Sequence, residues 1–121
     1  MKAGDCFHGC LPNSGKIPHY WVVLADPCSA GFVPLVNFTT PTGAPMAHIV
    51  TQASFPVLKY DSEVAWGYAD IRPASAIEAA IKAGLFVVQK SMSAAELVAV
   101  LRGGSERGLI SRQILKKLAG K

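Results

Sequence analysis

The hydrophobic pattern of the chain changes its period near residue 75. Before that point, aromatic and β-branched residues form short runs that are separated by proline and glycine. Runs bounded by such turn-forming residues are typical of β-strands. Residues 11–18, which are rich in Pro, Asn, Ser and Gly, indicate a loop. The pattern predicts extended segments over residues 6–10, 19–27, 31–40, 47–53 and 55–71.

After that point the hydrophobic residues recur at helical spacing. Ser75 and Glu78 match a capping box, in which the serine side chain caps a helix and the glutamate reaches back to it. The helix over about 75–83 is predicted to end at Gly84, where a left-handed backbone is favoured. Residues 85–90, LFVVQK, indicate a last strand or an extended link.

Two further helices are predicted near the C-terminal end. Ser93 and Glu96 repeat the capping box and open a helix that runs to about Leu101 and is closed by Gly103 and Gly104. Beyond it, residues 109–118 carry apolar side chains at helical spacing, with basic side chains on the other face.

This order of elements predicts a fold class that is mainly β with short helices (α+β). Five or six short strands with proline and glycine between them favour a small curled sheet or barrel. The helices are expected to cover one side or one open end of it. A chain of 121 residues has the length of a single domain, here residues 1–121.

Composition narrows the class of protein further. Hydrophobic residues make up 50% of the chain, which excludes global disorder, and the net charge of +4 is mildly basic. The chain shows no secretory signal pattern and no apolar run of the roughly 20 residues that span a membrane. Three cysteines are an odd number, which argues against a disulfide framework. We therefore expect a cytoplasmic protein with reduced thiols.

The segment CFHGC at residues 6–10 raises the question of a metal site. Along one strand Cys6, His8 and Cys10 point to the same face, but the first and last lie too far apart to share a zinc ion without a bend. The Cys-x-x-Cys pattern of zinc sites is absent. We predict no metal site and small, half-buried strand residues, while a metal module that also uses Cys28 remains a minor alternative.

Five short motifs stand in a distinctive order. They are Gly4-Asp5, HYWVVLADP at 19–27, VNFTT at 36–40, DSEV at 61–64 and ADIR at 69–72. Together they resemble the PemK/MazF family of toxin ribonucleases over roughly residues 3–102, and residues 104–121 form a helical extension. The resemblance implies an SH3-like barrel with C-terminal helices, a homodimer and a cognate antitoxin protein as partner.

The resemblance also implies an endoribonuclease, a hydrolase of single-stranded RNA that uses no metal and no other cofactor. His19 stands where catalytic members of the family carry an arginine, and Thr39 where a catalytic or phosphate-contacting hydroxyl is common. Asp70 lies one position away from an acidic residue that some members use. These three residues are the predicted catalytic set.

The chemistry of the residues is consistent with that set. Metal-free RNA cleavage needs a base for the 2′-hydroxyl, an acid for the leaving oxygen and a donor for the phosphorane oxygens. An imidazole can be the acid or the base, and Asp70 or His48 could be the second proton carrier. The residues predicted to bind RNA are Thr40, His48, Lys59, Ser62 and Arg72. Candidate surfaces for base stacking are Tyr20, Trp21, Tyr60 and Trp66.

A second interpretation stays open because the family arginine is missing. In this interpretation the chain is a catalytically inactive SH3-like module that binds protein or nucleic acid. Several candidates also have ordinary structural explanations. Trp21 lies in an apolar run that predicts a core position, and His48 alternates with Ile49 in a way that predicts a solvent-facing side chain.

Overall fold

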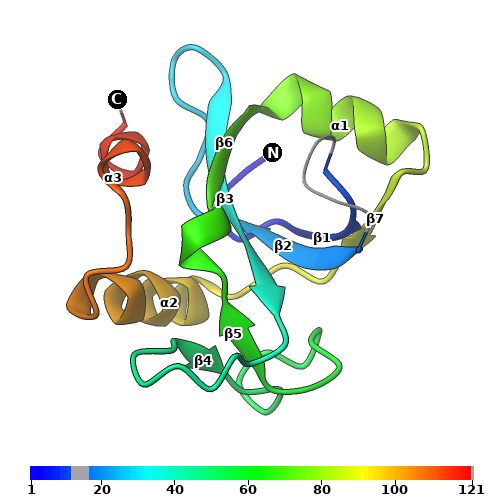
Figure 1. Cartoon of the computed structure of the whole chain (residues 1–121). Coiled ribbons are helices and arrows are strands. Elements are labelled where there is room, and N and C mark those ends of the chain that lie inside the picture. The colour runs from blue at the N-terminus through cyan, green and yellow to red at the C-terminus, as the bar shows by residue number, and fades with distance from the viewer. Residues whose placement is uncertain (12–16, 121) are drawn as a thin grey trace.

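A computed structural model describes residues 1–11 and 17–120, so most of the loop predicted over 11–18 lies outside the described residues. In this part of the chain, strands and helices form the predicted α+β fold (Figure 1). The strands are β1 (Cys6–Gly9), β2 (His19–Val23), β3 (Phe32–Thr39), β4 (Ile49–Val50), β5 (Ser62–Val64), β6 (Asp70–Pro73) and β7 (Phe86–Gln89). The helices are α1 (Ala74–Lys82), α2 (Ala94–Glu106), α3 (Arg112–Leu118) and the 3₁₀-helix η1 (Trp66–Tyr68).

One antiparallel sheet contains all of these strands. Its order is β4-β5-β3-β2-β1-β7, and β6 also pairs with β3. The long strand β3 therefore pairs with β2 along one edge and with β5 and then β6 along the other. The sheet is open and is not the closed barrel that the sequence suggested. In the described part of the chain its end strands β4 and β7 pair with β5 and β1 and not with each other.

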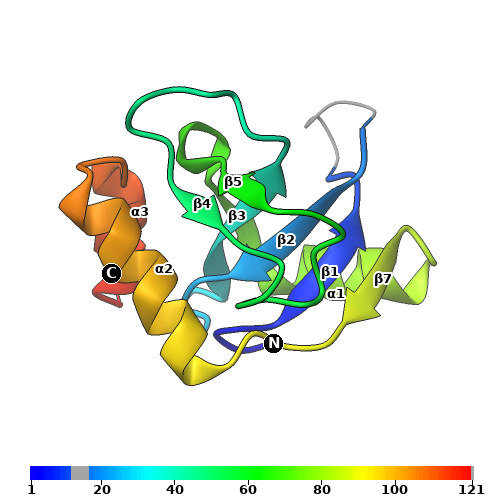
Figure 2. The same cartoon turned by 90° about the horizontal axis from the view of Figure 1, so that it is seen from below.

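Both faces of the sheet are buried, since alternate residues of β2 and β3 point into different clusters. Val22 and Val36 belong to a cluster that α2 and α3 cover, whereas Trp21 and Leu35 belong to a second cluster that α1 covers. Figures 1 and 2 show α1 on one side of the molecule and α2 and α3 together on the other. Trp21 is a core residue, as predicted.

The helix boundaries correct two predictions. Ser75 is not a cap: α1 begins at Ala74 after Pro73, and no side chain caps it. Ser93 does cap α2, and its side chain accepts a hydrogen bond from the N–H of Glu96. The helix α2 does not end at Gly103 and Gly104 but continues to Glu106. Within the described residues, no helix is both long and apolar enough to cross a membrane.

The predicted strand over 47–53 is also shorter than expected. Only Ile49–Val50 pairs in the sheet, and turns follow. The N–H groups of Ser54 and Phe55 donate to the carbonyl of Thr51, so the backbone here bonds within its own turns and not to a neighbouring strand. The side chains of Phe55 and Leu58 still reach the core.

Candidate functional site

Two histidines and a lysine line one small cleft with a volume of about 120 Å³. His8 lies on β1, His19 begins β2, and Lys59 lies in the segment that leads to β5. Pairing between β1 and β2 brings the two histidines to neighbouring positions, because Gly9 pairs with His19 and His8 pairs with Tyr20. The lining residues are His8, Pro18, His19, Tyr20, Phe38, Lys59, Tyr60 and Ser62.

Local contacts hold the walls of this cleft in place. The rings of His8 and Tyr20 lie 4.5 Å apart between their centroids, so the tyrosine supports the imidazole. On the other wall, the Ser62 hydroxyl donates to the carbonyl of Tyr60 over 2.9 Å. The Tyr60 hydroxyl and Oγ1 of Thr40 form a hydrogen bond of 3.2 Å. This hydrogen bond connects the segment before β5 to the residue that follows β3.

The hydrogen bond of His19 determines which of its nitrogens is available. Its Nδ1 lies 3.2 Å from the carbonyl oxygen of Phe38. A carbonyl oxygen only accepts hydrogen bonds, so Nδ1 carries a proton and donates it. The other nitrogen, Nε2, is therefore the one that can exchange a proton with a bound molecule.

Burial and nearby positive charges act on the imidazole of His8. Burial lowers the pKa of His8 below its ordinary value of 6.5, and the positive charges of Lys59 and His19 lower it further. His8 is therefore neutral near pH 7 and can accept a proton. The ammonium group of Lys59 gives the cleft a positive charge that attracts an anionic group such as phosphate.

The predicted catalytic set is divided between different places. His19 begins β2 and Thr39 ends the neighbouring β3, but His19 lines the cleft and Thr39 lines a second pocket. Asp70 pairs across the sheet with Leu35, and its carboxylate is bonded to the Arg72 side chain at 2.6 Å. Asp70 and Arg72 line neither the cleft nor the second pocket.

The residues predicted to bind RNA are divided in the same way. Lys59 and Ser62 line the cleft, although Ser62 is buried. Thr40 is exposed and touches the cleft through its bond to Tyr60. The prediction that His48 faces solvent is wrong, because its side chain is only 6% exposed and the exposed neighbour is Ile49.

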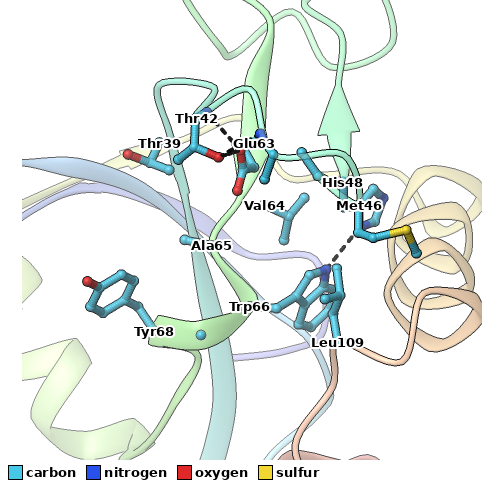
Figure 3. A pocket seen from close by; sticks show the side chains of 13 residues that line it. Thr39, Thr42, Met46, His48, Glu63, Val64, Ala65, Trp66, Tyr68 and Leu109 are labelled. Carbon is cyan, nitrogen blue, oxygen red and sulfur yellow. Dashed lines mark hydrogen bonds between the residues drawn. The ribbon is translucent and has the colours of Figure 1, made fainter.

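The second pocket is larger, about 250 Å³, and mostly apolar (Figure 3). Its wall contains the pair His48 and Trp66, in which Nε1 of the indole donates to Nδ1 of the imidazole at 2.9 Å. At the other side, the carboxylate of Glu63 accepts hydrogen bonds from the N–H and the hydroxyl of Thr42. The polar groups of these four residues are therefore hydrogen-bonded to one another in two pairs.

The cysteines do not form a metal site in the described part of the chain, where no three potential ligands come together. Cys6 is buried, and burial raises its thiol pKa to about 12. Cys28 is far along the chain, in the turn between β2 and β3, and its sulfur lies 3.9 Å from Nζ of Lys117.

The sequence reasoning considered His8 only as a metal ligand and missed that it lines the cleft. The sequence held one signal for this position, because a strand over these residues places His8 on the same face as Cys6. The residues that then surround His8 depend on how the strands pair.

Comparison of the chain with known protein families, with curated proteins and with solved structures found no match.

Proposed function

We propose that the cleft binds single-stranded RNA and cleaves it without a metal ion. The single observation that carries this proposal is the meeting of His8, His19 and Lys59 at one small cleft. Two imidazoles and one ammonium group supply the base, the acid and the charge stabilisation that phosphodiester transfer needs. This set replaces the predicted one, of which it keeps only His19.

The proposed reaction assigns one role to each imidazole. Neutral His8 takes the proton of the 2′-hydroxyl, whose oxygen attacks phosphorus. The bond from phosphorus to the 5′-oxygen breaks, and protonated His19 gives the proton on Nε2 to that leaving oxygen. The products are a 2′,3′-cyclic phosphate and a free 5′-hydroxyl. Lys59 stabilises the negative charge that develops on the non-bridging oxygens.

Aromatic residues beside the cleft favour unpaired nucleotides as the substrate. Tyr60 lines the cleft and is half-exposed, so one face of its ring is available to a base. Stacking of a base on an aromatic ring contributes about 1–3 kcal/mol and requires a base that is not in a duplex. A folded double helix would not present its bases to so small a cleft.

The proposal includes the toxin role that the family resemblance implies. RNA cleavage in the cytoplasm arrests growth, and an antitoxin that covers the cleft restores it. The curled sheet, in which β3 pairs with β5 and β6 in succession, supports a relationship to SH3-like barrels. The charge of +4 favours an anionic partner in either role.

The decisive experiment is an RNA cleavage assay in the presence of EDTA. A single-stranded oligonucleotide is incubated with the wild type and with His8→Gln, His19→Gln and Lys59→Ala. Loss of a general acid or base lowers the rate by about 10²–10⁴. Mass spectrometry should find a cyclic phosphate end, and a 2′-deoxy substitution at the cleaved position should abolish the reaction.

Matched controls separate this site from the one predicted from sequence. Thr39→Ala and Asp70→Asn lie outside the cleft and should leave the rate nearly unchanged. Equal losses in Thr39→Ala would favour the predicted set over the cleft. RNA binding without any cleavage would favour the inactive binding module, and the absence of both would reject the proposal.

A further inference from the structure

The second pocket shares no lining residue with the cleft, although both are built on β3 and β5. Thr39 and Glu63, which pair across these strands, line the pocket, whereas Phe38 and Ser62 line the cleft. The proposed nuclease reaction does not use the pocket. It is therefore a separate candidate for the binding of a ligand.

Small side chains leave the space that forms this pocket. Ala44, Ala47, Ala65 and Gly67 all line it. A β carbon added to Gly67 would meet no atom within 4 Å. Pockets for drug-sized ligands usually measure about 300–1,000 Å³, so a pocket of about 250 Å³ fits a smaller molecule.

Glu63 brings a negative charge to the pocket that no nearby cation neutralises. Its Oε1 accepts both hydrogen bonds from Thr42. Its Oε2 forms no hydrogen bond with the described residues, and none of the ion pairs among those residues involves Glu63. The pocket therefore offers one carboxylate oxygen to a positively charged group.

Apolar side chains lie on both sides of this carboxylate. Tyr68 is 78% exposed and Met46 is 59% exposed, and both line the pocket. Figure 3 shows Glu63 between Tyr68 on one side and Met46 and Trp66 on the other. Aromatic rings attract cations to their faces, and a methionine side chain adapts its shape to a bound ring. The pocket thus combines one negative charge with an apolar, partly aromatic wall.

We propose that this pocket binds a small organic cation, an arylalkyl amine whose ammonium group donates a hydrogen bond to Oε2 of Glu63. The apolar body of the amine lies against Met46, Trp66 and Tyr68. A primary ammonium group suits the carboxylate because it carries a positive charge and donates hydrogen bonds. A metal ion suits the site less well, because no three metal-ligating side chains come together among the described residues.

This inference is independent of the proposed nuclease activity, because its test measures binding and not cleavage. The probe is phenethylamine, which is titrated into the isotope-labelled whole protein and followed by NMR. Binding should saturate with a dissociation constant of about 1 mM or below, as is usual for so small a molecule. The indole N–H signal of Trp66 should shift, whereas that of Trp21, which donates to the carbonyl of Gly9 in the other core cluster, should not.

Three analogues of the probe separate charge from shape. Phenethyl alcohol has nearly the same shape without the charge, and phenylacetate carries the opposite charge. Both should bind at least about tenfold more weakly than phenethylamine. Butylamine keeps the charge but has no ring, as a lysine side chain of a partner protein would, and it should also bind about tenfold more weakly.

Two variants test the two halves of the site. Glu63→Gln keeps an oxygen for Thr42 but removes the charge, so it should weaken phenethylamine binding about tenfold or more and leave phenethyl alcohol binding unchanged. Tyr68→Ala removes an exposed ring and should weaken the binding of both molecules by a similar factor. Glu96→Gln is the matched control, because Glu96 is an exposed glutamate of α2 that lines neither the cleft nor the pocket. It should leave both affinities unchanged, and circular dichroism should show that all three variants remain folded.

Three results would overturn the inference. The first is a lack of saturable phenethylamine binding at concentrations up to about 10 mM. The second is equal or tighter binding of any of the three analogues, which would remove the charge or the ring from recognition. The third is an unchanged affinity for phenethylamine in the folded Glu63→Gln protein, which would place the ammonium group elsewhere.

Discussion

Replacement of Gly104 by alanine should destabilise the protein although alanine is the better helix former. Gly104 lies inside α2 against the ring of Trp66. A methyl group built at Gly104 would lie 2.6 Å from Cε2 and Cζ2 of that ring. Carbon atoms pack best at about 3.5–4.0 Å, so the overlap is roughly 1 Å.

The ring of Trp66 cannot easily move away from such a methyl group. It is 5% exposed, and its Nε1 donates to Nδ1 of His48. A shift would therefore disturb a buried hydrogen bond as well as the packing around the ring. Overpacking of a core costs about 1–3 kcal/mol, whereas alanine in place of glycine gains about 1 kcal/mol in a helix. The expected net loss in the free energy of unfolding is therefore up to about 2 kcal/mol.

The assay is urea denaturation followed by circular dichroism, with the midpoint and slope compared between variants. Ser105→Ala changes the next, exposed residue of α2 and should alter stability by less than about 0.5 kcal/mol. In a Trp66→Phe background the smaller ring leaves space, so Gly104→Ala should be much less harmful there. A Gly104→Ala protein as stable as the wild type, with no dependence on Trp66, would refute the reasoning.

Three other predictions test separate parts of the structure. Burial and then Arg107 lower the pKa of His48 below 6.5, so the folded state binds fewer protons. Stability should be full above that pH and fall as the solution is acidified, and His48→Gln should flatten this fall in denaturation curves. Lys59→Ala should reduce the slope of log affinity for RNA against log salt by about one phosphate contact, whatever the RNA sequence, in a fluorescence titration. Hydrogen bonds from the backbone of Phe32 lower the pKa of Cys28, so mass spectrometry should find this thiol alkylated well before buried Cys6.

The elements of the fold were predictable where local chemistry decides them. The alternation of β2 and β3 predicted strands, and the capping serine of α2 predicted the start of that helix. Gly84 follows α1 with a φ of 78°, as its predicted role requires. These features depend on residues close together in the sequence.

The end of α2 was not predictable because a tertiary contact explains its glycines. Gly103 and Gly104 looked like a helix stop, since glycine is unfavourable inside a helix. In the structure they are the points where the helix meets the rings of His48 and Trp66, and a methyl group at either would meet those rings within 2.7 Å. The glycines permit close packing there, and no local pattern distinguishes that role from a helix end.

The candidate site shows the same division between local and long-range information. The motifs drew attention to His19, but its partners depend on the register of β1 against β2, in which Cys6 pairs with Val22 and His8 with Tyr20. A shift of one residue would turn His8 to the opposite face of the sheet and end the contact between its ring and the ring of Tyr20. The register is held by burial: Cys6 and Phe7 enter different cores, so the same slip would move both apolar side chains out of place. The packing of Cys6 and Phe7 therefore determines that His8 lies against Tyr20 at the cleft, and this is why the chemistry of the cleft cannot be read from the motif around His19 alone.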